Sequence, residues 1–208
     1  MSTLLKLDSS PMGDHSISRK LTTKFADTWL KSHPDGNVIT RDLTTLNLPV
    51  VDASWIAAAH QPEEALTGDQ KKALAISDSL IADLQQADEY VIGVPMHNFG
   101  IPSTLKLWID QIARGGKTFT YGAAGPKGLL IGKKATLLIA SGGVYEPGTA
   151  MASFNFVAPY LRTVFAFLGV ADVNIIAAEG TAQLMTGKVD PAAFLAPSLE
   201  KVHHHASL

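Results

Sequence analysis

The 208-residue sequence contains no cysteine, and this absence removes several kinds of chemistry at once. Disulfides, thiolate nucleophiles and thiolate metal ligands are all excluded. A redox reaction in this protein would therefore depend on a bound cofactor. Met1 to Asp8 lack the long apolar stretch and the cleavage site of a signal peptide, so we expect a cytoplasmic protein.

Charge of either sign is also scarce. Charged residues make up 17% of the chain, the net charge is -2, and lysine and arginine are scattered. A nucleic-acid-binding or membrane-binding protein would show a basic patch, and no run is apolar enough to span a bilayer. We therefore expect neither partner. The 46% hydrophobic composition indicates a well-buried globular chain, which we take as one domain over residues 1–208.

Short apolar runs alternate with longer stretches of helical periodicity. This pattern is typical of βαβ units around a parallel sheet buried on both faces, so it predicts an α/β fold. The second strand has a β-branched core and follows the turn Pro34-Asp35-Gly36-Asn37. The five predicted strands are Leu4–Asp8, Val38–Arg41, Tyr90–Val94, Ala135–Ile139 and Val173–Ala177.

Helices are predicted between these strands from their ends and their apolar stripes. Ser16 supplies a hydroxyl N-cap, and Thr67-Gly-Asp-Gln70 has the form of a capping box. Residues 117–131, which glycine and proline interrupt, are predicted as an irregular insert or a hairpin. The other predicted helices span Ser103–Ala113 and about Ser16–Lys31, Ser153–Leu168 and Pro191–His203.

Three adjacent histidines, His203–His205, follow the last predicted helix. Such a run can bind a metal, but after a terminal helix it is more often a frayed or cloning-derived end. We expect an end of that kind and predict no metal site.

In an open parallel sheet, ligands bind beyond the carboxyl ends of the strands, where the strand order switches direction. This rule selects Ser9–Ser18, Pro95–Pro102 and Ala140–Gly148. The first of these loops opens a helix, so its amides and the hydroxyls of Ser10, Ser16 and Ser18 would suit a phosphate. It matches neither a dinucleotide fingerprint nor a Walker loop. A capped polar turn accounts for its composition equally well.

The second loop has restricted backbone positions beside flat or polarizable side chains. Met96 and Phe99 could contact a planar ring, and the Asn98 amide could pair with a ring edge that carries donors and acceptors. A tight crossover is the alternative for this loop. In the third loop, the amides of Gly142 and Gly143 could approach a ligand closely and stabilise an anionic ring, whereas a lone Gly-Gly is otherwise only a turn.

These residues together resemble the FMN-dependent NADH:quinone and azo-compound oxidoreductases, the azoreductase family formerly described as acyl carrier protein phosphodiesterases. The similarity covers nearly the whole chain. Its most specific parts are Pro95-Met-His-Asn-Phe-Gly-Ile-Pro-Ser-Thr-Leu-Lys106, Ile112-Ala-Arg-Gly-Gly-Lys-Thr-Phe-Thr-Tyr121, and Gly125-Pro-Lys-Gly-Leu129 leading to Gly132-Lys-Lys134.

The resemblance implies a flavodoxin-like three-layer sandwich, with a five-stranded parallel sheet of order 2-1-3-4-5. It also implies a homodimer with two FMN sites at its interface. Tyr121 would line the substrate pocket, and Phe167 would come from the other subunit. The residues implied for FMN are Ser10, Ser16, Ile17 and Ser18 for the phosphate, Met96, His97, Asn98 and Phe99 for the ring, and Ala140, Ser141, Gly142 and Gly143 for its pyrimidine side.

Two positions depart from the family pattern. His97 stands where tyrosine is common, and its main-chain role can survive the change. Ala140-Ser141 stands where many members have Ser-Arg, which removes a hydroxyl and a cation near the flavin. As a substrate-pocket residue His97 is either a proton donor to the reduced acceptor or a loop histidine without such a role.

The activity implied is transfer of two electrons from NADH or NADPH to quinones and azo compounds, by a ping-pong mechanism in one shared pocket. The cofactor carries the chemistry, which fits the lack of a catalytic triad. The alternatives are a flavodoxin-type electron carrier, which is typically strongly acidic, a hydrolase, for which no nucleophile and base are evident, and a non-catalytic α/β scaffold.

Overall fold

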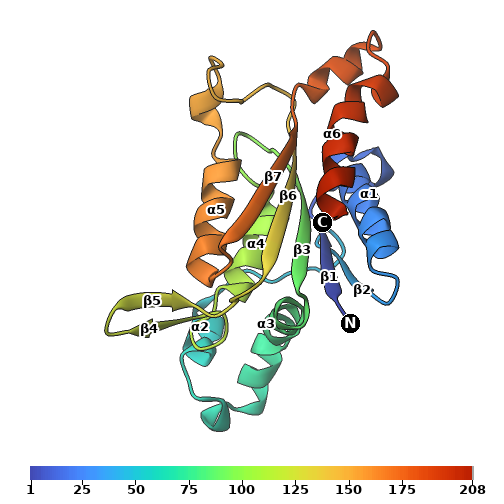
Figure 1. Cartoon of the computed structure of the whole chain (residues 1–208). Helices are drawn as coiled ribbons and strands as arrows, with labels where there is room; N and C mark the ends of the chain where they lie inside the picture. Colours follow the sequence, from blue (N-terminus) through green and yellow to red (C-terminus); the bar gives the residue numbers. More distant parts are fainter. Residues whose placement is uncertain (208) are drawn as a thin grey trace.

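The computed structural model describes residues 1–207, and a five-stranded sheet forms its centre. The strands lie in the order β2-β1-β3-β6-β7, and all neighbouring pairs are parallel. Counted along the chain among themselves, they have the order 2-1-3-4-5, so the predicted sheet is confirmed (Figure 1). The strands are β1 (Thr3–Asp8), β2 (Asn37–Asp42), β3 (Glu89–Pro95), β6 (Lys134–Ala140) and β7 (Asp172–Ala178).

Helices cover both faces of the sheet, because successive strand side chains point to opposite faces. Leu4, Val91 and Leu138 pack with buried residues of α1 and α6. Leu5 and Leu137 face the other way and pack with α3, α4 and α5. The predicted three-layer sandwich is therefore confirmed (Figure 1). These helices are α1 (Ile17–Ser32), α3 (Gly68–Gln86), α4 (Ser103–Ile112), α5 (Val157–Leu168) and α6 (Pro191–Ala206).

The predicted helix starts are confirmed at two positions. The Ser16 hydroxyl accepts a hydrogen bond from the main-chain N–H of Arg19 at 3.2 Å and caps α1. Thr67 and Gln70 exchange the two hydrogen bonds of a capping box at the start of α3. Among residues 1–207, no helix combines the length and the apolar character that crossing a membrane would require.

Helix α5 begins later than the sequence predicts, at Val157 and not near Ser153. A 3-10 turn, η3 (Ala152–Phe154), comes first. The chain is then held by a long-range bond, since the Phe156 N–H donates to the Phe99 carbonyl at 3.1 Å. This contact fixes the start of α5 beside the loop that follows β3.

The stretch 117–131 contains a hairpin, which settles the choice left open by its composition. Strands β4 (Phe119–Gly122) and β5 (Gly125–Gly128) pair in antiparallel fashion and project from the body of the molecule (Figure 1). A Cβ placed on Gly128 would lie 2.1 Å from the main-chain nitrogen of Gly169. Glycine is therefore required where the hairpin meets the end of α5.

A short helix, α2 (Ala53–Ala59), was not predicted. It begins at Asp52, whose carboxylate accepts a hydrogen bond from the Trp55 main-chain N–H at 2.8 Å. The buried Trp55 indole donates to the Gln111 side-chain oxygen on α4 at 3.0 Å. Seven residues are too few for a clear helical period, so the helix depends on this cap and on the tryptophan contact.

The expectation of a frayed end at His203–His205 is wrong, because α6 continues to Ala206. Val202 and Ala206 lie one helical turn apart and are 0% and 1% exposed in the cluster shared with α1. The three histidines belong to this helix, and its buried stripe holds it against α1.

Candidate cofactor-binding site

The three loops selected from the sequence lie together at the carboxyl edge of the sheet. Strands β1, β3 and β6 are parallel neighbours, so their ends fall at the same edge. The Ser9 hydroxyl donates to the Gly93 carbonyl at 2.7 Å and ties the first loop to β3. The Met96 N–H donates to the Ala140 carbonyl at 2.8 Å and ties the second loop to the third. The edge therefore presents one continuous set of loops.

The first loop presents hydroxyls and unpaired amides together at the start of α1. Ser10, Ser16 and Ser18 are all nearly buried, and the hydroxyl oxygens of Ser16 and Ser18 lie 3.2 Å apart. Within the described residues, the main-chain N–H groups of Ile17 and Ser18 have no acceptor. Such donors at a helix N-terminus suit an anion, so the donor set fits a phosphate.

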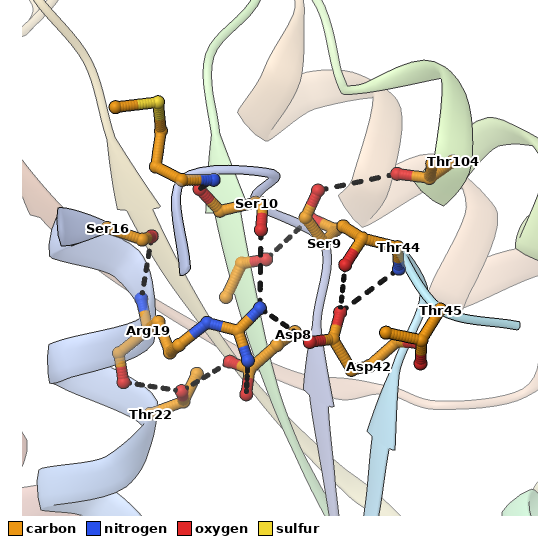
Figure 2. Close-up of polar contacts among 12 residues, drawn as sticks. Asp8, Ser9, Ser10, Ser16, Arg19, Thr22, Asp42, Thr44, Thr45 and Thr104 are labelled. Atoms are coloured by element: carbon orange, nitrogen blue, oxygen red, sulfur yellow. Dashed lines mark hydrogen bonds and ion pairs between the residues drawn. The ribbon is translucent and has the colours of Figure 1, made fainter. Parts of the chain in front are cut away.

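A charged cluster supports this loop from below, between β1, β2 and α1 (Figure 2). The Asp8 carboxylate is 1% exposed and accepts a hydrogen bond from the Thr22 hydroxyl at 2.6 Å. The Arg19 guanidinium lies 3.5 Å from Asp8 and 2.8 Å from Asp42. Partial burial acts to raise the pKa of Asp42, but hydrogen bonds from Thr44 and Arg19 and the charge of Arg19 outweigh it and lower that pKa.

The second loop turns sharply through two residues in the left-handed region. His97 and Gly100 exchange main-chain hydrogen bonds at 3.0 Å in both directions. Between them Asn98 has φ 48° and Phe99 has φ 69°, which is the pattern of a type I′ turn. Phenylalanine is strained in this conformation, whereas asparagine tolerates it. The turn directs the N–H groups of both residues away from their own hydrogen-bonded pair.

The carbonyl groups of the third loop are held by hydrogen bonds from the segment that follows β7. The N–H groups of Gly180, Thr181 and Ala182 donate to the carbonyls of residues 143, 141 and 142, at 2.9, 3.0 and 3.2 Å. The N–H groups of Gly142 and Gly143 have no acceptor among residues 1–207. These two amides, on a loop at the carboxyl edge, suit a carbonyl oxygen or an anionic ring.

An aromatic wall beside the second loop was missed by the sequence reasoning. The Phe99 ring lies 6.4 Å from Tyr145 in an edge-on arrangement and 5.4 Å from Phe154. The Tyr145 N–H donates to the Glu179 carboxylate at 2.8 Å, which fixes the start of the loop that carries both rings. Tyr145, two residues after the Gly-Gly turn, was the available local signal, whereas Phe154 lies eleven residues after Gly143.

The structure does not bring Tyr121 and Phe167 of the same chain to this edge. Phe167 lies ten helical residues beyond Val157 on α5, a separation of about 15 Å. Phe119 packs between the two residues, with ring centroids 5.6 Å from Tyr121 and 4.7 Å from Phe167. Tyr121 is 72% exposed on the hairpin. His97, in contrast, lies exposed on the second loop itself.

Comparison with known proteins agrees with this fold and edge. The family model described as a flavodoxin-like fold matches residues 2–203. An FMN-dependent NADH:quinone oxidoreductase of Acidobacterium capsulatum is 53% identical over 207 residues and covers 100% of both chains. A second protein with this activity in its name, from Burkholderia lata, is 50% identical and covers 97% of this chain and 98% of its own.

Solved structures extend the comparison to the azoreductases. The azoreductase from Bacillus anthracis str. Sterne has a TM-score of 0.89 and 29% identity, covering 100% of this chain and 99% of its own. An FMN-dependent NADH-azoreductase from Bacillus anthracis str. Ames Ancestor, in complex with FMN, has a TM-score of 0.87, 29% identity, and coverage of 100% and 98%. The chain belongs to the flavodoxin-like family and, within it, to the FMN-dependent NADH:quinone oxidoreductases and azoreductases. The resemblance is confirmed, and so is its enzyme class, oxidoreductase.

Proposed function

We propose that this protein is an FMN-dependent oxidoreductase that passes two electrons from NADH or NADPH to quinones and azo compounds by a ping-pong mechanism. The observation that carries the proposal is the set of unpaired main-chain amides on three loops at one sheet edge. One end of this set suits a phosphate and the other suits a ring carbonyl, as FMN requires. When bound, FMN would supply the hydride chemistry, and the chain would orient it and set its electrostatics.

Each loop has a separate part in holding the cofactor. The first loop would bind the phosphate, the second would support the ring, and the third would donate to its pyrimidine side. Because the carbonyl of Ala140 is occupied by Met96 and the Ser141 hydroxyl donates to the Gly143 carbonyl at 3.0 Å, these residues contribute mainly by shaping the third loop. The proposed contacts are Ser10, Ser16, Ile17, Ser18, Met96, His97, Asn98, Phe99, Ala140, Ser141, Gly142 and Gly143.

The aromatic wall would line the place where both substrates bind. Phe99, Tyr145 and Phe154 offer flat surfaces to a nicotinamide, a quinone or an azo compound. A single shared place requires the oxidised donor to leave before the acceptor enters. The ping-pong order follows from that exclusion.

We also propose that the protein works as a homodimer, with the partner subunit completing each substrate pocket. Tyr121 is highly exposed, and it and Phe167 lie far from the flavin loops of their own chain, as expected if they serve the site of a second copy. Further exposed apolar side chains, Ile131 at 65% and Phe156 at 59%, are available to such an interface. The chain would act as a single domain in the cytoplasm, on small molecules and not on nucleic acid or membranes.

An absorption spectrum of the purified protein tests the cofactor, since bound flavin absorbs near roughly 450 nm. Addition of NADH without oxygen should bleach this band, and a quinone should restore it over many turnovers. A one-electron carrier of the flavodoxin type would bind FMN without steady oxidation of NADH. A colourless protein that cannot be reconstituted with FMN would refute the proposal.

A further inference from the structure

The loop proposed to hold the phosphate contains no lysine or arginine between Ser9 and Ser18. The ionisable side chains of this loop, Asp14 and His15, are exposed, so a phosphate dianion there would depend on hydroxyls and amides, while two carboxylates, Asp8 and Asp42, lie beneath the same loop (Figure 2). Uncompensated, these carboxylates would repel the dianion. The charge beneath the loop must therefore be balanced from another residue.

Arg19 is placed to supply this balance. Its guanidinium contacts both carboxylates, through Nη1 to Asp8 and Nη2 to Asp42 (Figure 2). Its side chain is only 20% exposed, so water screens these pairs less than surface pairs. Lys6 also pairs with Asp8, and its side chain is 12% exposed. With both cations present the cluster has no net charge.

Arg19 also holds both ends of the loop. Nη2 donates to the main-chain carbonyl of Ser10 at 3.3 Å, and the main-chain N–H donates to the Ser16 hydroxyl at 3.2 Å. The first bond turns the Ser10 carbonyl toward the cluster and away from the bound anion, which a carbonyl oxygen would repel. A planar guanidinium can reach all these acceptors at once, whereas a lysine ammonium is a single compact point.

We propose that Arg19 is a positioning residue that fits the first loop to a phosphate group, by neutralising Asp8 and Asp42 and by turning the Ser10 carbonyl inward. The inference rests on the proposed function, because the phosphate is that of FMN. Arg19 contacts the first loop through Ser10 and Ser16, and within residues 1–207 it makes no hydrogen bond to the loops proposed for the ring. Arg19 therefore affects how strongly the protein prefers FMN over riboflavin, which has the same ring system but no phosphate.

The alternative is that Arg19 only joins α1 to β1 and β2. Loss of such a connection would lower the stability of the fold and weaken the binding of FMN and riboflavin equally. The ratio of the two dissociation constants separates these roles, because riboflavin uses the second and third loops and lacks the group that the first loop binds.

The test measures the binding of FMN and of riboflavin to the full chain freed of flavin, by quenching of flavin fluorescence, with thermal unfolding recorded in parallel. Arg19→Lys should raise the Kd for FMN about tenfold or more, the loss expected for charged hydrogen bonds. The Kd for riboflavin should change by less than about twofold. Inorganic phosphate should compete with FMN in the wild type and less so in the variant.

Asp42→Asn provides an independent measurement if Arg19→Lys does not fold. It removes one carboxylate and keeps the guanidinium, so preference for FMN over riboflavin should rise by about threefold. The matched control is Lys31→Gln, which removes one positive charge from the exposed end of the same helix and should leave the ratio unchanged.

Equally weaker binding of FMN and riboflavin in Arg19→Lys would overturn the role of Arg19. A lower preference for FMN over riboflavin in Asp42→Asn would overturn it as well. Failure of the wild-type chain to bind FMN would instead overturn the proposed function itself. The two failures are thus distinguishable within one set of titrations.

Discussion

The main-chain N–H of Met96 donates to the carbonyl oxygen of Ala140 at 2.8 Å, one residue beyond Pro95, which forms the last β3–β6 pair with Ala140. The bond carries the sheet ladder into the loops that follow the two strands. The turn of the second loop and the amides of the third loop are therefore held at a fixed spacing by the sheet. This bond makes the candidate site rigid.

The backbone strain at Phe99 can be measured with two substitutions that remove the same ring. Phe99→Ala keeps a Cβ at φ 69°, whereas Phe99→Gly relieves the strain. The glycine variant should therefore be more stable than the alanine variant by about 1 kcal/mol in urea unfolding. Both should lose activity toward quinones to a similar extent, because both lack the aromatic surface. Equal stability of the two variants would argue against the left-handed turn.

The hydroxyl groups of Ser16 and Ser18 have different structural roles. Ser16 caps α1, so Ser16→Ala should lower the free energy of unfolding by about 1 kcal/mol and also weaken the binding of FMN. Ser18 lies at the second helical position and caps nothing in the described chain. Ser18→Ala should weaken the binding of FMN with little change in the free energy of unfolding. Thermal unfolding without flavin and FMN titration check the pair, and a large loss of stability in Ser18→Ala would contradict this division.

Acid should remove the contribution of Asp42 to stability. Because the folded-state pKa of Asp42 is lowered, its contribution is fully present above the unfolded pKa of about 3.9 and is lost as pH falls through the folded pKa. The stability difference between wild type and Asp42→Asn should be constant from about pH 5 to 7 and shrink below about pH 4. Denaturant titrations at several pH values measure it. Asp27→Asn, at an exposed position on α1, should show no such trend.

Substitution of His97 tests whether the side chain at this position, where the family usually has tyrosine, donates a proton to the acceptor. Its main chain already performs a role, the paired bonds to Gly100, and its exposed ring has no hydrogen bond within residues 1–207. His97→Phe should therefore keep the rate within about twofold and leave the pH profile unchanged. Loss of one limb of the profile in the variant would instead identify the imidazole as a proton donor to the acceptor.

Hybrid dimers test both the proposed homodimer and the subunit proposed to supply Tyr121. Tyr121→Ser should impair the site of the partner, and Phe99→Ala should impair the site of its own chain. A dimer that combines one chain of each kind has one site without either change, so it should recover about half of the wild-type activity. The two parent variants should each stay impaired. No recovery in the hybrid would place Tyr121 in the site of its own chain.

The sheet and the three loops could be predicted from the sequence, because their signals are local. Apolar runs such as Ala135–Ile139 identify buried strands, and parallel order brings their ends to one edge. The role of Arg19 could not be predicted, because Asp42 reaches it from a strand 23 residues away. Position in the sequence does not reveal that the two share a cluster.

The misses have related physical causes. Helix α2 depends on a contact between Trp55 and Gln111, 56 residues apart. The delayed start of α5 depends on the Phe99 carbonyl, and the ordered end of α6 on its packing against α1. In each case a tertiary contact decides a boundary that local propensity leaves open.

The bonds from Gly180, Thr181 and Ala182 to the third loop have one more consequence. In the proposed function the amides of this loop donate to the pyrimidine side, where they would favour the electron-rich form of the flavin, so their orientation would set how readily it gives up electrons. That orientation is held by the segment after β7, which lies behind the loop. The driving force of the proposed reaction would thus be adjustable from the rear of the site, by substitutions that leave every proposed contact with cofactor and substrate in place.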